Sequence, residues 1–184
     1  MSDLVVLVGN PRAGSRTSTL AAALAEGLVA ELAERGVTVT GTCVLEVSAL
    51  VGVNFTDRAI APSAPQVDAI DVIRQARVLV VATPSYKGTY TGLLKVFLDQ
   101  LPHQALAGVA AVPVAIAGSP VHAVATAADL RRLLLELGAD APAVVEVLEA
   151  KLDDIDAIVR QSARTVIDEV AGYLTPEATT VDVV

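Results

Sequence analysis

The chain has 184 residues, enough for one domain with a sizeable core. Apolar residues make up 53% of the sequence and the formal net charge is −8, with only 13 Lys and Arg, which argues against nucleic-acid binding because phosphate backbones need a dense basic surface. The apolar runs are shorter than the roughly 18 to 20 residues of a membrane span, and residues 1–3 lack the basic start of a signal peptide, so we expect a cytoplasmic protein that makes no membrane contact.

Short apolar runs that predict β-strands alternate along the chain with segments of helical periodicity. The first run, residues 4–8, is unbroken, as in a parallel strand buried on both faces. A helix over residues 18–35 follows, with leucines four apart at 20, 24, 28 and 32. The later predictions are strands at 37–47, 77–83, 109–117 and 143–148, helices at 66–76, 90–101, 124–137 and 153–174, and a long loop at 48–65. Pro113 is unusual for the centre of a strand ladder.

This alternation predicts one α/β domain over residues 1–184, with residues 174–184 as a loosely ordered tail. Right-handed crossovers give a doubly wound five-stranded parallel sheet, order 2-1-3-4-5, with helices on both faces. Ligands in such sheets bind beyond the carboxyl ends of the strands. The loops after strands one, three and four should therefore meet at one site.

The loop after the first strand, GNPRAGSRTS over residues 9–18, contains two arginines, three hydroxyls and two glycines. Backbone N–H groups at a helix N-terminus, hydroxyls and Arg guanidinium groups together suit a phosphate. The alternative is an ordinary strand-to-helix loop with a capping residue, but two arginines exceed what capping needs. The loop matches neither the dinucleotide fingerprint nor the P-loop, which disfavours ATP and dinucleotide binding of those types.

Two further loops complete the predicted site. In the loop at 83–92, small residues let the backbone approach a flat ligand, and Tyr86 offers either a stacking surface or a plug over the sheet end. The loop at 118–122 can present backbone N–H groups to a heterocycle. His122 is either part of that contact or a plain loop histidine.

Two motifs, GNPRAGSRTS at 9–18 and ATPSYKGTYTGLLKVFLD at 82–99, resemble those of the NADPH-dependent FMN reductases, which have a flavodoxin-like fold. The resemblance covers residues 4–137 and is greatest to the branch that supplies reduced flavin to two-component monooxygenases, such as those acting on alkanesulfonates. It implies that the FMN phosphate is held by Arg12, Ser15, Thr17 and Ser18. The isoalloxazine and ribityl chain would lie beside Pro84, Ser85, Tyr86, Lys87, Gly88 and Thr89, and the ring site would be completed by Gly118 and Ser119. The chain departs from the family where Ser119-Pro120 follows Gly118 in place of a Gly-Gly pair, and where Val109 replaces a lysine.

The resemblance implies hydride transfer from NADPH, or NADH, to FMN, which requires no catalytic acid, base or metal. It also implies a homodimer or homotetramer, a flavin-dependent monooxygenase as partner, and Tyr90 in a bulged helix at the subunit interface, although Tyr90 also suits an ordinary helix start. With no Trp and few other rings, one flavin face should stay open, so FMN can exchange as a substrate. Two alternatives remain: a reductase of quinones or azo compounds that keeps its FMN, and a flavodoxin-type electron carrier.

Overall fold

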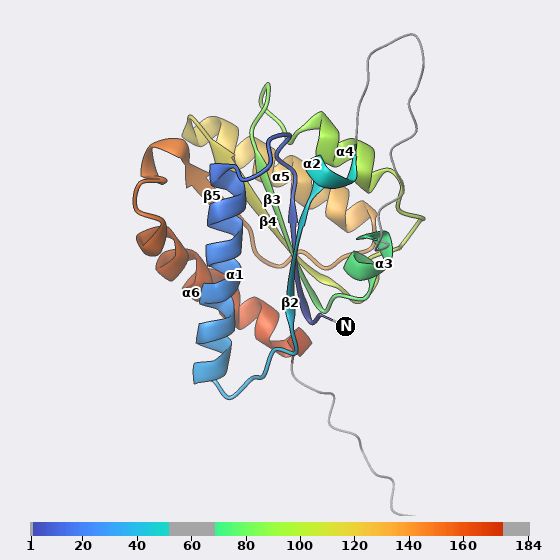
Figure 1. Cartoon of the computed structure of the whole chain (residues 1–184), viewed down its shortest axis with the longest axis vertical. Coiled ribbons are helices and arrows are strands. Elements are labelled where there is room, and N and C mark those ends of the chain that lie inside the picture. Colours follow the sequence, from blue (N-terminus) through green and yellow to red (C-terminus); the bar gives the residue numbers. More distant parts are fainter. Residues whose placement is uncertain (1, 52–68, 175–184) are drawn as a thin grey trace, which may run out of the picture.

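The computed structural model describes residues 2–51 and 69–174 (Figure 1). Its five strands form one parallel sheet in the order β2-β1-β3-β4-β5, which confirms the predicted topology. The strands are β1 (Leu4–Val8), β2 (Thr42–Glu46), β3 (Val78–Pro84), β4 (Ala110–Ala117) and β5 (Val145–Leu148).

Helices cover both faces of the sheet, as the alternation of elements predicts (Figure 1). On one face lie α1 (Arg16–Glu34) and α6 (Ile155–Leu174), which pack against each other. The other face is covered by the short helices α2 (Val47–Leu50), α3 (Ala69–Arg74) and α4 (Gly92–Leu98), together with α5 (Pro120–Glu136). A 3₁₀ turn, η1 (Glu149–Lys151), follows β5.

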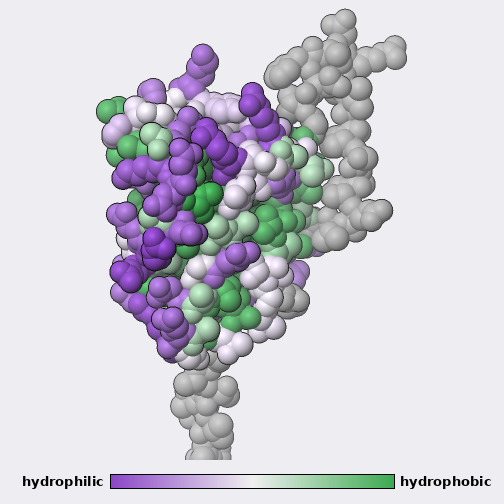
Figure 2. Space-filling model, turned by 60° about the vertical axis from the view of Figure 1, so that its left-hand side comes forward, coloured by the Kyte–Doolittle hydropathy of each residue, from purple (hydrophilic) through white to green (hydrophobic). Residues whose placement is uncertain are grey.

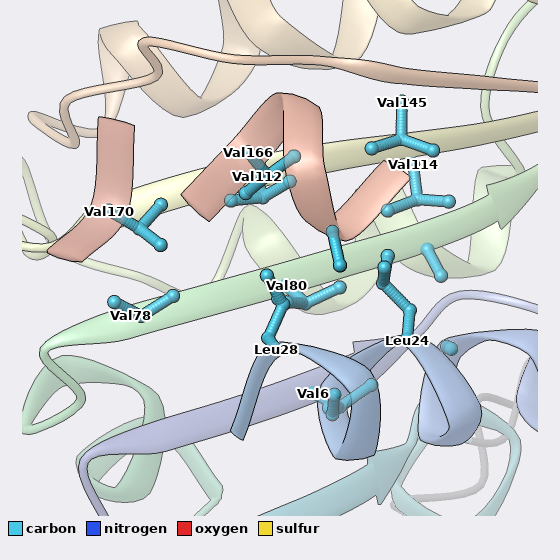
Figure 3. Packing of buried hydrophobic residues seen from close by; sticks show 14 of the residues in the cluster. Val6, Leu24, Leu28, Val78, Val80, Val112, Val114, Val145, Val166 and Val170 are labelled. Atoms are coloured by element: carbon cyan, nitrogen blue, oxygen red, sulfur yellow. The ribbon is translucent and has the colours of Figure 1, made fainter. Parts of the chain in front are cut away.

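Two apolar clusters form the core, one on each face, because successive strand residues point to opposite sides of the sheet. Val6, Val80 and Val112 contribute to the first cluster and meet Leu24 of α1 and Val166 of α6 (Figure 3). Val5, Leu79 and Ala111, one position earlier on the same strands, belong to the second cluster. The central strands β1, β3 and β4 are buried along their whole length, which explains why their sequences are apolar apart from Thr83 near the end of β3.

The element boundaries differ from the sequence prediction where capping decides them. Residue 37 starts no strand, because Val37 N–H donates to the carbonyl of Leu32 (2.9 Å) and so closes the end of α1. Helix α5 begins at Pro120, four residues before the predicted start, because the Ser119 side chain caps it and proline suits its first turn. Helix α2 begins at Val47, the last residue of the predicted strand, and continues into the predicted loop at 48–65. Residues 52–65 of that loop, residues 66–68 of the predicted helix and the tail from 175 lie outside the described residues.

Pro113 is accommodated in β4 by the direction of its nitrogen. Ala110 N–H donates to Arg77 on the β3 side, and Ala111 N–H donates to Asp140 on the opposite side. Since N–H groups alternate along a strand, the Pro113 nitrogen also points away from β3. The missing N–H therefore removes no bond from the β3–β4 ladder. On the opposite side, pairing with β5 begins only at Val114, one residue after Pro113.

The surface over α1 and α6 is mostly polar, with smaller apolar areas between (Figure 2). Arg35 at the end of α1 forms an ion pair with Asp168 of α6. In the described part of the chain, no helix is both long enough and apolar enough to span a bilayer.

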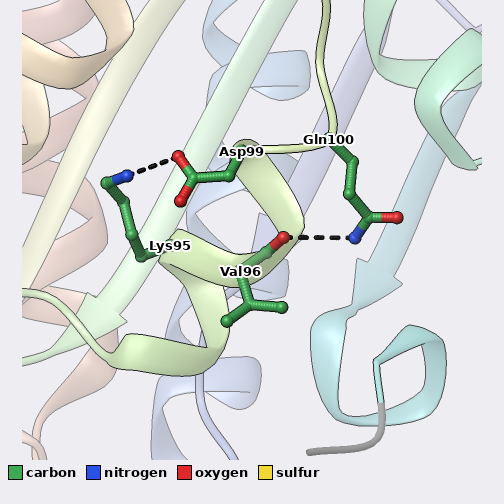
Figure 4. Close-up of polar contacts among 4 residues, drawn as sticks. All are labelled: Lys95, Val96, Asp99 and Gln100. Carbon is green, nitrogen blue, oxygen red and sulfur yellow. Dashed lines mark hydrogen bonds and ion pairs between the residues drawn. The ribbon is translucent and has the colours of Figure 1, made fainter. Parts of the chain in front are cut away.

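At the C-terminal end of α4, two local contacts extend the last turn (Figure 4). Lys95 pairs with Asp99, and the Gln100 side chain donates to the carbonyl of Val96 at 3.2 Å. The hydrogen bond to Asp99 raises the pKa of Lys95 above its usual value.

Candidate functional site

The loop after β1 is held close to α4. Gly9 N–H donates to Ala82 of β3 (2.7 Å), and the Thr91 hydroxyl donates to the Gly9 carbonyl while accepting from Leu94 N–H. A Cβ atom at Gly9 would lie 2.8 Å from the Leu94 side chain. Glycine is therefore required by close packing, and the first loop is fixed relative to the second.

Asn10 organises the interior of the first loop and is 8% exposed. Its Oδ1 accepts from Arg12 N–H at 2.9 Å, so its amide nitrogen must be the group that lies 3.0 Å from Thr17 Oγ1. Thr17 Oγ1 therefore accepts from Asn10, which leaves the Thr17 hydroxyl proton free to be donated to another group.

Helix α1 starts directly after this loop and directs its N-terminus to the same edge of the sheet. Ser15 is the N-cap, and its side-chain oxygen accepts from Ser18 N–H at 3.2 Å. The Ser18 hydroxyl donates to Glu46 of β2. Unpaired N–H groups and the helix dipole favour an anion at this end.

The loop after β3 is a miniature hairpin. Tyr86 and Thr89 exchange backbone hydrogen bonds of 2.8 and 3.3 Å, and the two residues between them, Lys87 and Gly88, have φ values of 56° and 87°. Positive φ at both positions defines a type I′ turn. The hairpin is joined to α5 by a 2.8 Å bond from the Thr89 hydroxyl to Asp129.

Ser85, just before the hairpin, is tied to two neighbouring elements. Its N–H donates to Ile116 of β4 (2.7 Å), and its hydroxyl accepts from Thr126 of α5 (2.8 Å). Tyr90 precedes Thr91, the N-cap of α4, so it lies before the helix and not in a bulge within it.

The start of α5 lies beside the hairpin. His122 belongs to the first turn of α5 and not to a loop, and its Cδ2 lies 4.0 Å from the position that a Cβ on Gly88 would take. Ser119 uses its side chain to cap the helix through His122 N–H (3.4 Å). Gly118 is exposed beside it.

These loops surround a hollow of about 280 Å³ at the carboxyl edge of the sheet. Five predicted site residues line it: Arg12, Ser15, Thr17, Pro84 and Tyr86. Ser85, Lys87, Gly88 and Thr89 continue the Pro84–Tyr86 side without lining the hollow, and Gly118 and Ser119 lie at the start of α5. Ser18 is bonded to Glu46 and does not line the hollow.

The lining also includes Arg16, the second arginine of the predicted phosphate loop, which the family resemblance did not assign to the site. Four further lining residues were not predicted: Asn10, Ile116, Glu149 and Leu152. Glu149 and Leu152 follow β5, the fifth strand to end at this edge. The rule that ligands bind beyond strand ends applies equally to that strand and could have identified them. No feature of the sequence points to Asn10, because the role of a buried loop amide becomes apparent only from its hydrogen-bond partners in the structure.

The donor set suits a phosphate ester with a flat group attached. Two guanidinium groups, the hydroxyls of Ser15 and Thr17 and a helix N-terminus occupy one side of the hollow. Tyr86, 45% exposed, provides an aromatic surface on the other side. Among the described residues, no group of three His, Cys, Asp or Glu side chains is arranged to hold a metal ion.

Comparison with known proteins gives consistent results. The model of the family described as NADPH-dependent FMN reductase matches residues 2–154. The chain is 40% identical over 133 residues to the NADH-dependent FMN reductase SfnF of Pseudomonas putida, covering 71% of this chain and 68% of that protein. It is 43% identical over 67 residues to an FMN reductase (NADPH) of Escherichia coli K12, covering 36% of this chain and 35% of that one.

A solved structure of similar fold is the apo form of the NADH:FMN oxidoreductase EMOB. Its TM-score is 0.71 at 28% identity, and the match covers 98% of this chain and 94% of that one. A flavodoxin from Streptococcus pneumoniae TIGR4 shares the fold at a TM-score of 0.55 and 20% identity, covering 90% of this chain and 97% of that one.

Proposed function

The chain belongs to the NADPH-dependent FMN reductase family, and from this premise we propose that it transfers a hydride from NADPH or NADH to FMN held at the hollow. The observation that carries the proposal is the hollow itself, whose lining combines two arginines, two hydroxyl residues and a half-exposed tyrosine at the carboxyl edge of the sheet. FMN bound there supplies a ring that accepts the hydride.

In this proposal, the residues around the hollow bind the FMN phosphate and orient the flavin ring. Arg12, Ser15 and Thr17 hold the phosphate, with Arg16 adding positive charge. The rigid hairpin from Tyr86 to Thr89 positions the ring, and Gly118 and Ser119 approach it from the start of α5. Since hydride passes directly between two rings, alignment is the main task of the protein.

The arrangement also favours FMN exchange. Tyr86 is the aromatic residue of the lining, so a flavin resting on it keeps its opposite face accessible to a nicotinamide. We therefore assign FMN the role of an exchangeable substrate, whose reduced form leaves for a flavin-dependent monooxygenase. The reaction belongs in the cytoplasm, where reduced nicotinamide nucleotides are regenerated, and the active species is a homodimer or homotetramer.

A steady-state assay tests the proposal. The purified protein is combined with NADPH or NADH and, in turn, with FMN, FAD or riboflavin. Oxidation of the nucleotide is followed by the loss of absorbance of its reduced nicotinamide ring. We expect oxidation that depends on added FMN. Oxidation without added flavin, with FMN retained on a desalting column, would instead indicate a reductase with bound FMN. FMN binding without any nicotinamide oxidation would indicate an electron carrier.

A further inference from the structure

Glu46, the last residue of β2, contacts the first loop from outside the hollow. It pairs in register with Val8, so its side chain stands beside the point where β1 ends and the loop begins. The two carboxylate oxygens accept from Gly14 N–H at 3.3 and 3.2 Å, and one of them also accepts from the Ser18 hydroxyl. One carboxylate thus bridges the last turn of the loop and the first turn of α1.

The contact lies at the point where the loop reverses direction. Gly14 has a φ of 60°, a left-handed conformation that glycine adopts in turns without steric cost. Ser15, the next residue, lines the hollow and caps α1. A bond that fixes Gly14 therefore also fixes the position from which Ser15 and Thr17 face the hollow.

Glu46 can affect a phosphate in two opposite ways. Its negative charge repels an anion, whereas its hydrogen bonds hold the loop in one shape. Glu46, Gly14 and Ser18 all lie outside the lining of the hollow, and the carboxylate is half-buried and compensated by the donors bonded to it. Screening weakens repulsion between partly exposed charges, while a pre-ordered loop loses less entropy on binding. We therefore expect the ordering of the first loop by Glu46 to affect phosphate binding more than the repulsion by its charge.

We propose that Glu46 is a positioning residue that holds the first loop in its phosphate-binding shape and thereby sets the preference for FMN over riboflavin. The inference rests on the proposed function, since it takes the hollow to be the phosphate site. It acts on the phosphate end alone, because the hairpin that faces the ring is secured separately to α5.

Glu46→Ala and Glu46→Gln separate the hydrogen bonds from the charge. In the glutamine variant the amide oxygen can still accept from Ser18 and Gly14, and the amide nitrogen can face Ser48, whose hydroxyl lies 3.5 Å from the second carboxylate oxygen. Glu34→Ala, at the exposed far end of α1, is the matched control that removes one negative charge away from the loop. The dissociation constants of FMN and riboflavin are measured by flavin fluorescence for all four proteins, with melting temperatures as a check on folding.

We expect Glu46→Ala to raise the Kd of FMN about tenfold, which corresponds to the lower end of the range for one hydrogen bond to a charged group, and to leave that of riboflavin within about twofold. Glu46→Gln should retain most of the affinity, and Glu34→Ala should match the wild type. Unchanged or tighter FMN binding by Glu46→Ala would overturn the proposal, as would an equal loss for both flavins. A wild type that binds the two flavins equally would overturn the phosphate assignment of the hollow, and with it the role of Glu46.

Discussion

At the scale of single residues, Arg12 is the side chain whose role is easiest to measure. It lines the hollow, and its backbone N–H is already held by Asn10. We expect Arg12→Ala to weaken FMN binding by about 1.5 to 3 kcal/mol, the usual range for a hydrogen bond to a charged group, without changing riboflavin binding. Parallel titrations with both flavins measure this. Unchanged FMN affinity would mean that the phosphate binds elsewhere.

Asn10 supports a second prediction about the same loop. In Asn10→Asp the carboxylate still accepts from Arg12 N–H but cannot donate to Thr17, whose hydroxyl would then turn toward the new acceptor. The hollow would lose a donor and gain a negative charge. We expect FMN affinity to fall at least about tenfold, as for a lost charge-assisted bond.

Asn10→Ser provides the comparison for this variant, because a hydroxyl can both accept from Arg12 N–H and donate to Thr17. Its FMN affinity should lie between those of the wild type and Asn10→Asp when all three are measured by calorimetry. If Asn10→Asp binds FMN as the wild type does, Thr17 does not donate to the phosphate.

The site residues divide by how they could be recognised from sequence. Arg12, Ser15 and Thr17 were predictable, because charged and hydroxyl groups between a buried strand and a helix have few other roles. Asn10 was not, since its function depends on bonds to residues two and seven positions away. That these side chains and Ser18 contact a phosphate remains a prediction, and in the structure the Ser18 hydroxyl is donated to Glu46.

At the scale of elements, the hairpin after β3 depends on its turn. Gly88 has a φ of 87°, and a Cβ there would contact His122 only at 4.0 Å. Gly88→Ala should therefore lower the free energy of unfolding by about 1 kcal/mol or more through backbone conformation alone. Urea denaturation measures the change.

Gly92→Ala is the matched control for that substitution. Gly92 is the first residue of α4, and a Cβ there meets no other atom within 4 Å. Alanine should be neutral or slightly stabilising at this helical position. Equal destabilisation by the two variants would show that the cost at Gly88 does not come from its positive φ.

The elements themselves were largely predictable, because unbroken apolar runs such as residues 4–8 have few alternatives in a chain of this length. The exact first and last residues of these elements were less predictable. The start of α5 depends on the rotamer of Ser119, and the start of β2 depends on how residues 35–37 close α1. Such local hydrogen bonds leave little trace in hydrophobic periodicity.

At the scale of the whole molecule, ligand binding should stabilise the folded chain. FMN at about 100 times its Kd adds about 2.7 kcal/mol to the free energy of unfolding if the unfolded chain does not bind it. For a domain of this size, that is a rise in Tm of roughly 5 to 10 °C. Differential scanning fluorimetry at several FMN concentrations tests this, and riboflavin at the same concentration should give a smaller shift.

The pH dependence of stability should include one alkaline component. Burial, together with the 3.0 Å bond to Asp140, raises the pKa of Tyr173, which joins α6 to the segment before β5. The protonated phenol stabilises the fold in full below pH about 10, its usual pKa, and this contribution declines as the pH rises through the raised value.

Tyr173→Phe should remove that component. Wild type and variant should differ by a constant free energy of unfolding below pH 9, a value roughly one unit under the usual tyrosine pKa. The difference should shrink above pH 10, as the wild type loses the bond. A difference that stays constant through the alkaline range would show that Tyr173 contributes packing but no hydrogen bond.

The hollow is assembled from segments far apart in the sequence, since its lining runs from Asn10 to Leu152. During synthesis on the ribosome, the first loop emerges long before the turn after β5, so a growing chain cannot display the complete site. FMN therefore cannot serve as a template for early folding. It can stabilise only the fully synthesised and folded chain, so it protects complete molecules from proteolysis but not truncated ones.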